Sequence, residues 1–117
     1  RLASREAPAA TLRWIRTSLG SAMKLIAIDD VLYFQSEDKY TKVVTAEGDS
    51  LIRKTIRELY DELDHEQFWQ VHRGTIVNLR AIAKVERDWR DQPLLTLKDR
   101  SEQLTVSRTF AHLFKAL

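Results

Sequence analysis

Three short clusters of cationic and hydroxyl side chains stand out in this sequence of 117 residues, because their residue types suit the recognition of anions. They are Lys39-Tyr-Thr-Lys42, His72-Arg-Gly74 and Ser107-Arg-Thr109. The planar guanidinium of arginine can hold guanine or a phosphate through two hydrogen bonds, whereas lysine and hydroxyl groups suit phosphate oxygens. Taken singly, each cluster is more often a solvated loop than a binding site. The combination is more informative than each cluster alone, because the acidic residues concentrate elsewhere, on residues 55–64.

The middle cluster lies within a regular apolar framework. Its apolar residues are Phe68, Trp69 and Val71 before the cluster, and Ile76 and Val77 after it. The glycine of the cluster lets the backbone approach a ligand closely. Asn78 ends the stretch, and we expect it to have the structural role of capping the bend that follows.

Short apolar and β-branched runs predict about nine strands joined by polar turns, without long crossover helices. The expected strands are Leu12–Thr17, Met23–Ile28, Val31–Phe34, Thr41–Thr45, Ser50–Lys54, the two halves of Phe68–Asn78, Ala83–Trp89, Leu94–Lys98 and Gln103–Ser107. Residues Gln35–Tyr40 are polar and are expected to form a loop. The pattern predicts a mainly β fold of elongated antiparallel sheets with short helices and a C-terminal helix.

Helical periodicity appears in two segments. The apolar residues of Thr55–Asp64 recur at helical spacing, and Thr55 with Glu58 matches a capping box. Thr109–Leu117 is expected to be the closing helix, with its apolar residues on one face. A further helical turn through Val31 and Leu32 is expected, with Asp29-Asp30 as its cap.

Composition excludes several classes of protein. The sequence has no cysteine, so disulfides and thiolate metal sites are ruled out, and a reducing cytoplasmic location is expected. Three scattered glycines cannot form a phosphate loop, and the three histidines lack the spacing of metal ligands, so we expect neither a cofactor nor a metal nor an enzyme. No stretch is long and apolar enough to span a membrane. Residues 1–24 hold five basic residues and one acidic residue, so the net charge of +2 reflects that segment.

Four segments, in order, make the chain resemble the LytTR-type DNA-binding domains, which are output modules of many bacterial response regulators. The matching segments are Ile28–Phe34 with Lys39 and Tyr40, Arg53–Leu63, Phe68–Asn78, and Leu104–Arg108 with Phe110–Leu117. The resemblance covers about residues 12–117. It implies stacked antiparallel sheets whose loops, rather than a recognition helix, enter successive major grooves of double-stranded DNA.

The resemblance also implies which residues contact DNA. The family's contacting positions fall on Lys39, Thr41, Lys42, His72, Arg73, Gly74, Ser107 and Arg108. We expect the two arginines to read base edges, and the lysines, Thr41 and Ser107 to hold phosphates. His72 either supports its loop or contacts the DNA backbone. Gly74 stands where the family usually has serine, which removes a hydroxyl contact and is expected to loosen the loop.

The sequence and the resemblance together indicate the domain organisation. Residues 1–11 are expected to be a linker remnant before a DNA-binding domain at 12–117. The resemblance implies a transcription regulator of a two-component phosphorelay, with an N-terminal receiver domain, direct-repeat DNA sites and a homodimer on DNA as one arrangement. The alternative is a protein-interaction module that docks a partner through exposed strands or the acidic helix. An RNA-binding β domain is less favoured, because no strand carries a pair of exposed aromatic residues.

Overall fold

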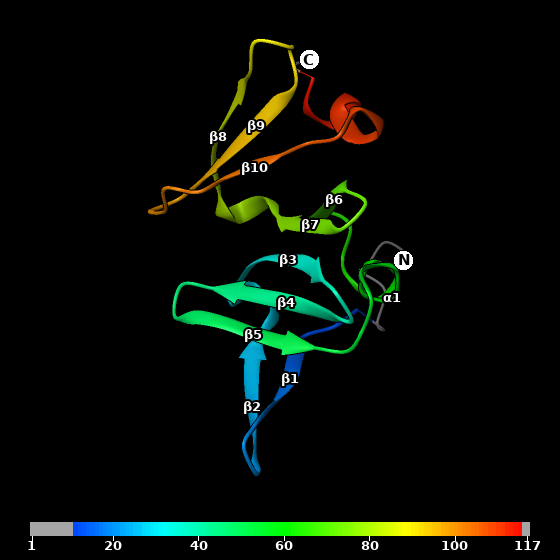
Figure 1. The fold of residues 1–117 in the computed structure, drawn as a ribbon, viewed down its shortest axis with the longest axis vertical. Coiled ribbons are helices and arrows are strands. Elements are labelled where there is room, and N and C mark those ends of the chain that lie inside the picture. Colours follow the sequence, from blue (N-terminus) through cyan, green and yellow to red (C-terminus); the bar gives the residue numbers. More distant parts are fainter. Residues whose placement is uncertain (1–10, 116–117) are drawn as a thin grey trace, which may run out of the picture.

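A computed structural model describes residues 11–115, which form three antiparallel sheets stacked along the longest axis of the molecule (Figure 1). The first sheet pairs β1 (Trp14–Leu19) with β2 (Ala22–Ala27). The central sheet has the order β5 (Gly48–Ile52), β4 (Tyr40–Thr45), β3 (Val31–Glu37), β7 (Thr75–Asn78) and β6 (Phe68–His72). The third has the order β10 (Gln103–Thr105), β9 (Pro93–Leu97) and β8 (Ile82–Arg87). The prediction of a mainly β, antiparallel fold is confirmed, whereas the predicted linker lies outside the described residues except for Thr11.

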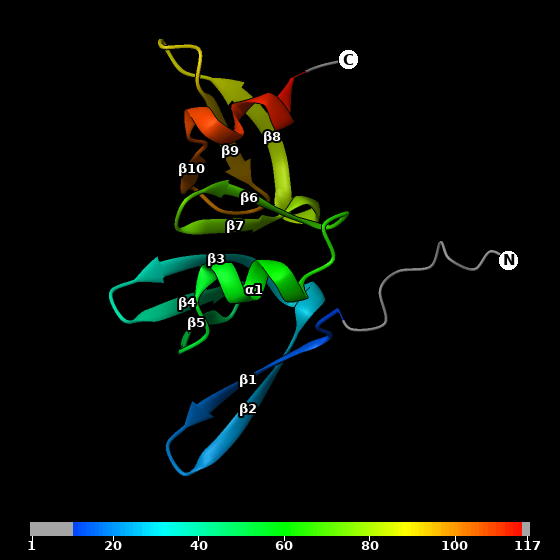
Figure 2. The same cartoon turned by 90° about the vertical axis from the view of Figure 1, so that its right-hand side faces the viewer.

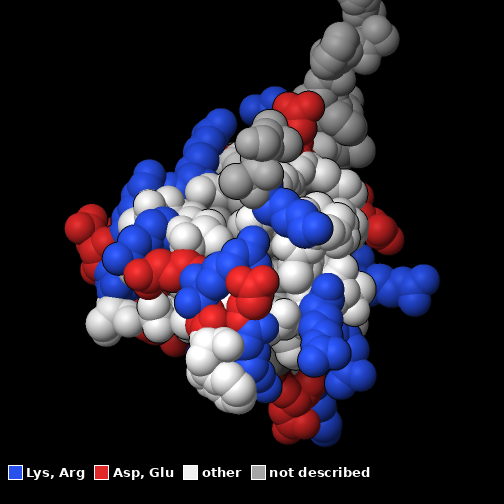
Figure 3. Space-filling view, turned by 90° about the horizontal axis from the view of Figure 1, so that it is seen from above, with Lys and Arg blue, Asp and Glu red and all other residues white. Residues whose placement is uncertain are grey.

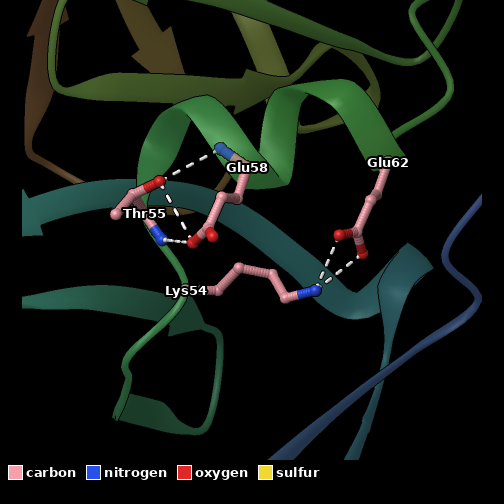
Figure 4. Close-up of polar contacts among 4 residues, drawn as sticks. All are labelled: Lys54, Thr55, Glu58 and Glu62. Atoms are coloured by element: carbon pink, nitrogen blue, oxygen red, sulfur yellow. Dashed lines mark hydrogen bonds and ion pairs between the residues drawn. The ribbon is translucent and has the colours of Figure 1, made fainter.

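The helices of the described part are short. They are α1 (Ile56–Glu62) and the 3₁₀ helices η2 (Ile28–Asp30), η3 (Leu79–Ala81) and η4 (Arg108–Phe114). The predicted capping box is confirmed, because the Thr55 hydroxyl accepts from the Glu58 amide at 3.1 Å while the Glu58 carboxylate accepts from the Thr55 amide at 2.9 Å (Figure 4). Lys54 pairs with Glu62 at 2.7 Å, which neutralises one carboxylate of this acidic helix (Figure 4).

Two expectations about local structure are wrong, and the position of a third element is refined. The predicted loop Gln35–Tyr40 shrinks to a turn at Asp38 and Lys39, because β3 runs on to Glu37 and its polar end is paired on both sides, with β4 and β7. The expected closing helix is present as the 3₁₀ helix η4, which begins one residue earlier, at Arg108; its last two expected residues lie outside the described part. Asp29-Asp30 does not cap a turn through Val31 but lies inside η2, after which Val31 begins β3.

Two hydrophobic cores lie on opposite faces of the central sheet. Successive strand residues alternate between them: Phe34, Val43 and Ile76 pack with β1, β2 and α1, whereas Tyr33, Val44 and Val77 pack against the third sheet and η4. This explains why β3 and β7 are apolar on both faces. The central sheet, which carries the first two clusters at the ends of its strands, is therefore packed on both faces.

Asn78 ties β7 to β3 and to η3, the short helix that leads into the third sheet. Its side chain is buried, its Nδ2 donates to the Val31 carbonyl at 2.9 Å, and its Oδ1 accepts from the Arg80 amide at 3.0 Å. The second bond caps η3, so the predicted structural role of Asn78 is confirmed.

Candidate nucleic-acid interface

The first two clusters lie at the same end of the central sheet. Strand β3 pairs with β7, so the β3–β4 turn that carries Lys39 lies beside the β6–β7 turn that carries Arg73. The Ser36 amide donates to the Gly74 carbonyl at 2.8 Å, which ties the two turns together directly. Figure 2 shows both turns projecting towards the same side of the molecule, at its left.

The third cluster joins them from the next layer. The Ser107 amide donates to the Val71 carbonyl at 2.9 Å, and this bond fixes the segment between β10 and η4 against β6. Trp69 and Phe114 add an edge-to-face aromatic contact with ring centroids 5.3 Å apart. The structure therefore brings all three predicted clusters onto one edge, where they follow one another along the long axis (Figure 2).

The β3–β4 turn presents fewer contact groups than its sequence suggests. Lys39 is exposed at the tip, and Lys42 is partly exposed and pairs with Glu37 at 3.7 Å. Asp38 occupies the other tip position with a φ of +59°, a conformation that aspartate tolerates better than most residues. Thr41 is buried, and its hydroxyl donates to the Lys54 carbonyl at 2.7 Å. The Thr41 side chain is thus a structural tie rather than a surface group.

One cation beside this turn was not predicted from sequence. Arg53 follows β5, and its guanidinium lies 5.9 Å from the ring centroid of the exposed Tyr40. The β4–β5 register places the two residues next to each other, since Thr41 pairs with Ile52. Arg53 therefore adds a positive charge to a turn in which Lys39 and Lys42 are offset by Glu37 and Asp38.

The β6–β7 turn is held from within. The Gln70 amide group donates to the carbonyls of His72 and Arg73 at 3.2 and 3.3 Å, and the Gly74 amide donates to Nδ1 of His72 at 3.3 Å. An accepting Nδ1 places the ring proton of neutral His72 on Nε2, which is then a donor. Arg73 is exposed at the tip. His72 thus supports the loop and can also donate outward.

Gly74 packs closely against Ser36 of the β3–β4 turn. A Cβ added at this position would lie 2.5 Å from Oγ of Ser36, so the Ser36 hydroxyl would have to turn to another rotamer. The glycine therefore leaves room for this hydroxyl between the two turns, and the loosening of the loop stays a prediction.

The third cluster begins η4. Ser107 is the N-cap residue, but its side chain makes no capping bond to the helix. Arg108 and Thr109 are exposed, whereas Phe110 and Phe114 pack against the second core. Arg108 therefore lies on a short helix whose apolar side packs against the second core.

An ion-pair cluster fixes the spacing between layers. Arg100 contacts Glu102 at 2.8 Å and donates to the Thr45 carbonyl at 3.4 Å, while the Tyr33 hydroxyl donates to Glu102 at 3.3 Å. The Arg100 guanidinium holds the pKa of Glu102 below its ordinary value. Burial, and then the Glu102 carboxylate, raise the pKa of Tyr33. These contacts join the β9–β10 turn to the central sheet.

The charge on the molecule is mixed. Seen from the end that carries the third sheet, Lys and Arg side chains are interspersed with Asp and Glu (Figure 3). Among residues 11–115, no group of His, Cys, Asp and Glu could hold a metal ion. In the same part of the chain, no helix has the length and hydropathy of a membrane span. On this face, charges of both signs are therefore mixed.

The family model described as the LytTr DNA-binding domain matches residues 21–117. The chain belongs to the LytTR family of DNA-binding domains. This family is defined by DNA binding and not by catalysis, and it serves transcription regulation. Strand β1 precedes the matched region, but it pairs along its whole length with β2, which lies entirely inside that region.

Curated relatives of this LytTR domain are longer proteins. An uncharacterised response regulatory protein of Vibrio cholerae is 41% identical over 106 residues, which cover 87% of this chain and 40% of that protein. The CO-responsive transcriptional regulator RcoM of Rhodospirillum rubrum is 36% identical over 71% of this chain and 36% of its own length. The chain thus spans about two fifths of the length of such relatives.

A solved structure has the same fold. The LytTr DNA-binding domain of a putative methyl-accepting/DNA response regulator from Bacillus cereus matches with a TM-score of 0.80 and 23% identity. The match covers 88% of this chain and 94% of that one. The predicted family is therefore confirmed by sequence, and the predicted architecture by structure.

Proposed function

We propose that this LytTR domain binds double-stranded DNA sequence-specifically through its three clusters, which enter successive major grooves, and that it is the output domain of a two-component response regulator. The observation that carries the proposal is the convergence of the clusters on one edge (Figure 2). Similarity to the response regulatory protein of Vibrio cholerae supports a receiver domain in the whole protein. A regulator of bacterial transcription acts in the cytoplasm. Direct-repeat sites, occupied by two copies, are part of the same proposal.

The proposed roles follow the exposure of each side chain. Arg73 and Arg108 stand at exposed tips and read base edges, since a guanidinium can bind guanine through two hydrogen bonds. Lys39, Lys42 and Ser107 bind phosphates, and Nε2 of His72 donates to a phosphate oxygen. Gly74 contributes its backbone and its fit against Ser36. Thr41 is left out of the contacts, because its hydroxyl is buried and already donates. Arg53 is added as a phosphate contact.

Selection of bound duplexes from a random pool, followed by footprinting, tests sequence specificity directly. With the selected site in hand, Arg73→Ala and Arg108→Ala should each remain folded and lose about 1–3 kcal/mol of discrimination at one base position. Arg80→Ala is the control, because Arg80 is also exposed but lies on η3, which follows the end of β7 opposite the β6–β7 turn. If both cluster variants discriminate as the wild type does, base readout by these arginines is wrong.

Salt dependence tests the phosphate contacts. Each phosphate neutralised on duplex DNA contributes about 0.9 to the slope of log affinity against log salt. Lys39→Ala should therefore weaken binding to every sequence and reduce the slope by about this amount. Lys42→Ala should have a smaller effect, because Glu37 competes with the phosphate for its ammonium group. Equal slopes for wild type and both variants would remove the lysines from the interface.

A further inference from the structure

The turn between β8 and β9, residues 88–92, carries the most exposed large apolar side chain of the described residues. Trp89 is 89% exposed, and the Arg90 guanidinium lies 5.2 Å from its ring centroid. Trp89 packs in neither core, so burial in the domain does not account for it. The turn lies at the end of the long axis beyond η4 (Figure 1) and projects towards the same side as the β3–β4 and β6–β7 turns (Figure 2).

The backbone of this turn is fixed by its own side chains. Oδ1 of Asp88 accepts from the amides of Arg90 and Gln92 at 2.8 and 2.9 Å, and the Asp91 amide donates to the Asp88 carbonyl at 2.9 Å. These bonds to the amide of Gln92, and then to that of Arg90, lower the pKa of Asp88. The Asp88 carboxylate therefore binds backbone amides of its own turn. These bonds order the turn that presents the Trp89 indole to solvent.

Arg87 connects the turn to the third cluster. Its guanidinium donates to the Asp91 carbonyl at 3.1 Å and to the Phe114 carbonyl at the end of η4 at 3.2 Å. Arg87 also faces the Asp91 carboxylate at 3.8 Å, so these two charges offset each other. Among residues 11–115, Arg90 makes no ion pair within 4.0 Å, but its charge helps to lower the pKa of Asp88, after the two hydrogen bonds to backbone amides. The turn therefore presents a cation on a flat apolar ring, on a segment tied to η4 by Arg87.

We propose that Trp89 and Arg90 bind the sugar-phosphate backbone of DNA flanking the recognised site. This inference rests on the proposed function, because the three clusters align the duplex with this edge. The chemistry fits a deoxyribose-phosphate strand: the indole ring packs on the sugar, and its N–H and the guanidinium bind phosphate oxygens. The contact carries no sequence preference and lies on one flank only.

Duplexes of stepped length test this proposal. The selected site is extended by about five base pairs, half a helical turn, on one flank at a time. Wild type should gain about tenfold in affinity on one flank, as expected for a charge-assisted contact worth about 1.4 kcal/mol. Trp89→Ala with Arg90→Ala should bind the short duplex as wild type does, lose the gain on that flank, and reduce the salt slope by about 0.9. Arg80→Ala should keep the gain.

The outcomes separate the two proposals. Wild type that binds the short duplex specifically, without a flank effect that depends on Trp89 and Arg90, overturns the flanking contact and leaves the proposed function intact. A wild type that selects no duplex overturns both. A double variant that binds DNA as wild type does but fails to bind an acidic partner protein would also overturn the DNA contact. Circular dichroism checks the fold, which should be unchanged because both side chains lie in solvent.

Discussion

Replacing Asn78 by alanine should destabilise the domain more than any other single amide substitution in the described part. The side chain is 2% exposed and makes two hydrogen bonds, to the Val31 carbonyl and from the Arg80 amide. Loss of an N-cap costs about 1 kcal/mol, and a buried carbonyl deprived of its donor costs about 1–3 kcal/mol. Asn78→Ala should therefore lower the free energy of unfolding by about 2–4 kcal/mol, a large part of the stability expected for a domain of this size.

Denaturant and thermal unfolding measure this loss. A change of this size lowers the melting temperature of a domain of about 100 residues by on the order of 10 to 20 °C. Gln103→Ala is the control, since Gln103 is an exposed amide, and its change should stay within about 0.5 kcal/mol. A loss below about 0.5 kcal/mol for Asn78→Ala would show that the two bonds do not stabilise the joint between sheets.

The aspartate substitution at the same position distinguishes the two bonds. Asn78→Asp keeps an acceptor for the Arg80 amide, but the new carboxyl can donate to the Val31 carbonyl only when it is protonated. Its pKa in the folded state should therefore lie above that of an unfolded aspartate, about 3.9. The hydrogen bond from the protonated carboxyl then stabilises the fold fully below about pH 3.9, and this stabilisation is lost as pH rises through the pKa of the folded state. The free energy of unfolding of Asn78→Asp should therefore be closer to that of wild type in acid than at neutral pH. A difference from wild type that does not change with pH would contradict the assigned bond to the Val31 carbonyl.

Three further predictions concern the supports of the candidate interface. Thr41→Val should lower stability by about 1 kcal/mol through loss of the bond to the Lys54 carbonyl, yet leave the DNA affinity of the folded protein unchanged; a parallel loss of affinity would restore Thr41 as a contact. Because Arg100 lowers the pKa of Glu102, the ion pair stabilises the fold above the ordinary glutamate range and loses its effect as pH falls. The stability difference between wild type and Glu102→Gln should accordingly be largest near neutral pH, and a difference that grows in acid would refute this. Thr55→Ala should cost about 1 kcal/mol through loss of the capping box, with no change in the salt slope of DNA binding.

The sequence predicted the fold well wherever local pattern decides structure. The capping box at Thr55 and the turn role of Asn78 depend on residues within a few positions of each other, and both are confirmed. The mainly β architecture follows from β-branched runs and polar turns. The family resemblance supplied what local pattern cannot, namely that three clusters far apart in sequence belong together.

The errors arose where partners distant in sequence decide structure. Gln35 and Ser36 are polar, yet they extend β3 because β7, some forty residues later, pairs alongside. The stacking of Arg53 on Tyr40 depends on the β4–β5 register, which the sequence does not fix. The burial of Thr41 could have been predicted from the sequence, because strand alternation puts Thr41 on the same face as the buried Val43, whereas Lys42 faces the other way.

The length of the domain limits how much sequence it can specify. The described part extends 47 Å along the axis that the three clusters follow, so it spans at most about 14 base pairs at about 3.4 Å each. The major groove faces the domain for about half of each turn of DNA, so about six or seven of these base pairs can be read. A word of six base pairs recurs by chance about once in 4,000, whereas a bacterial genome offers at least about 10⁶ competing positions. With the proposed function, one domain does not single out one promoter, whereas two adjacent copies, which would read about twelve base pairs, would.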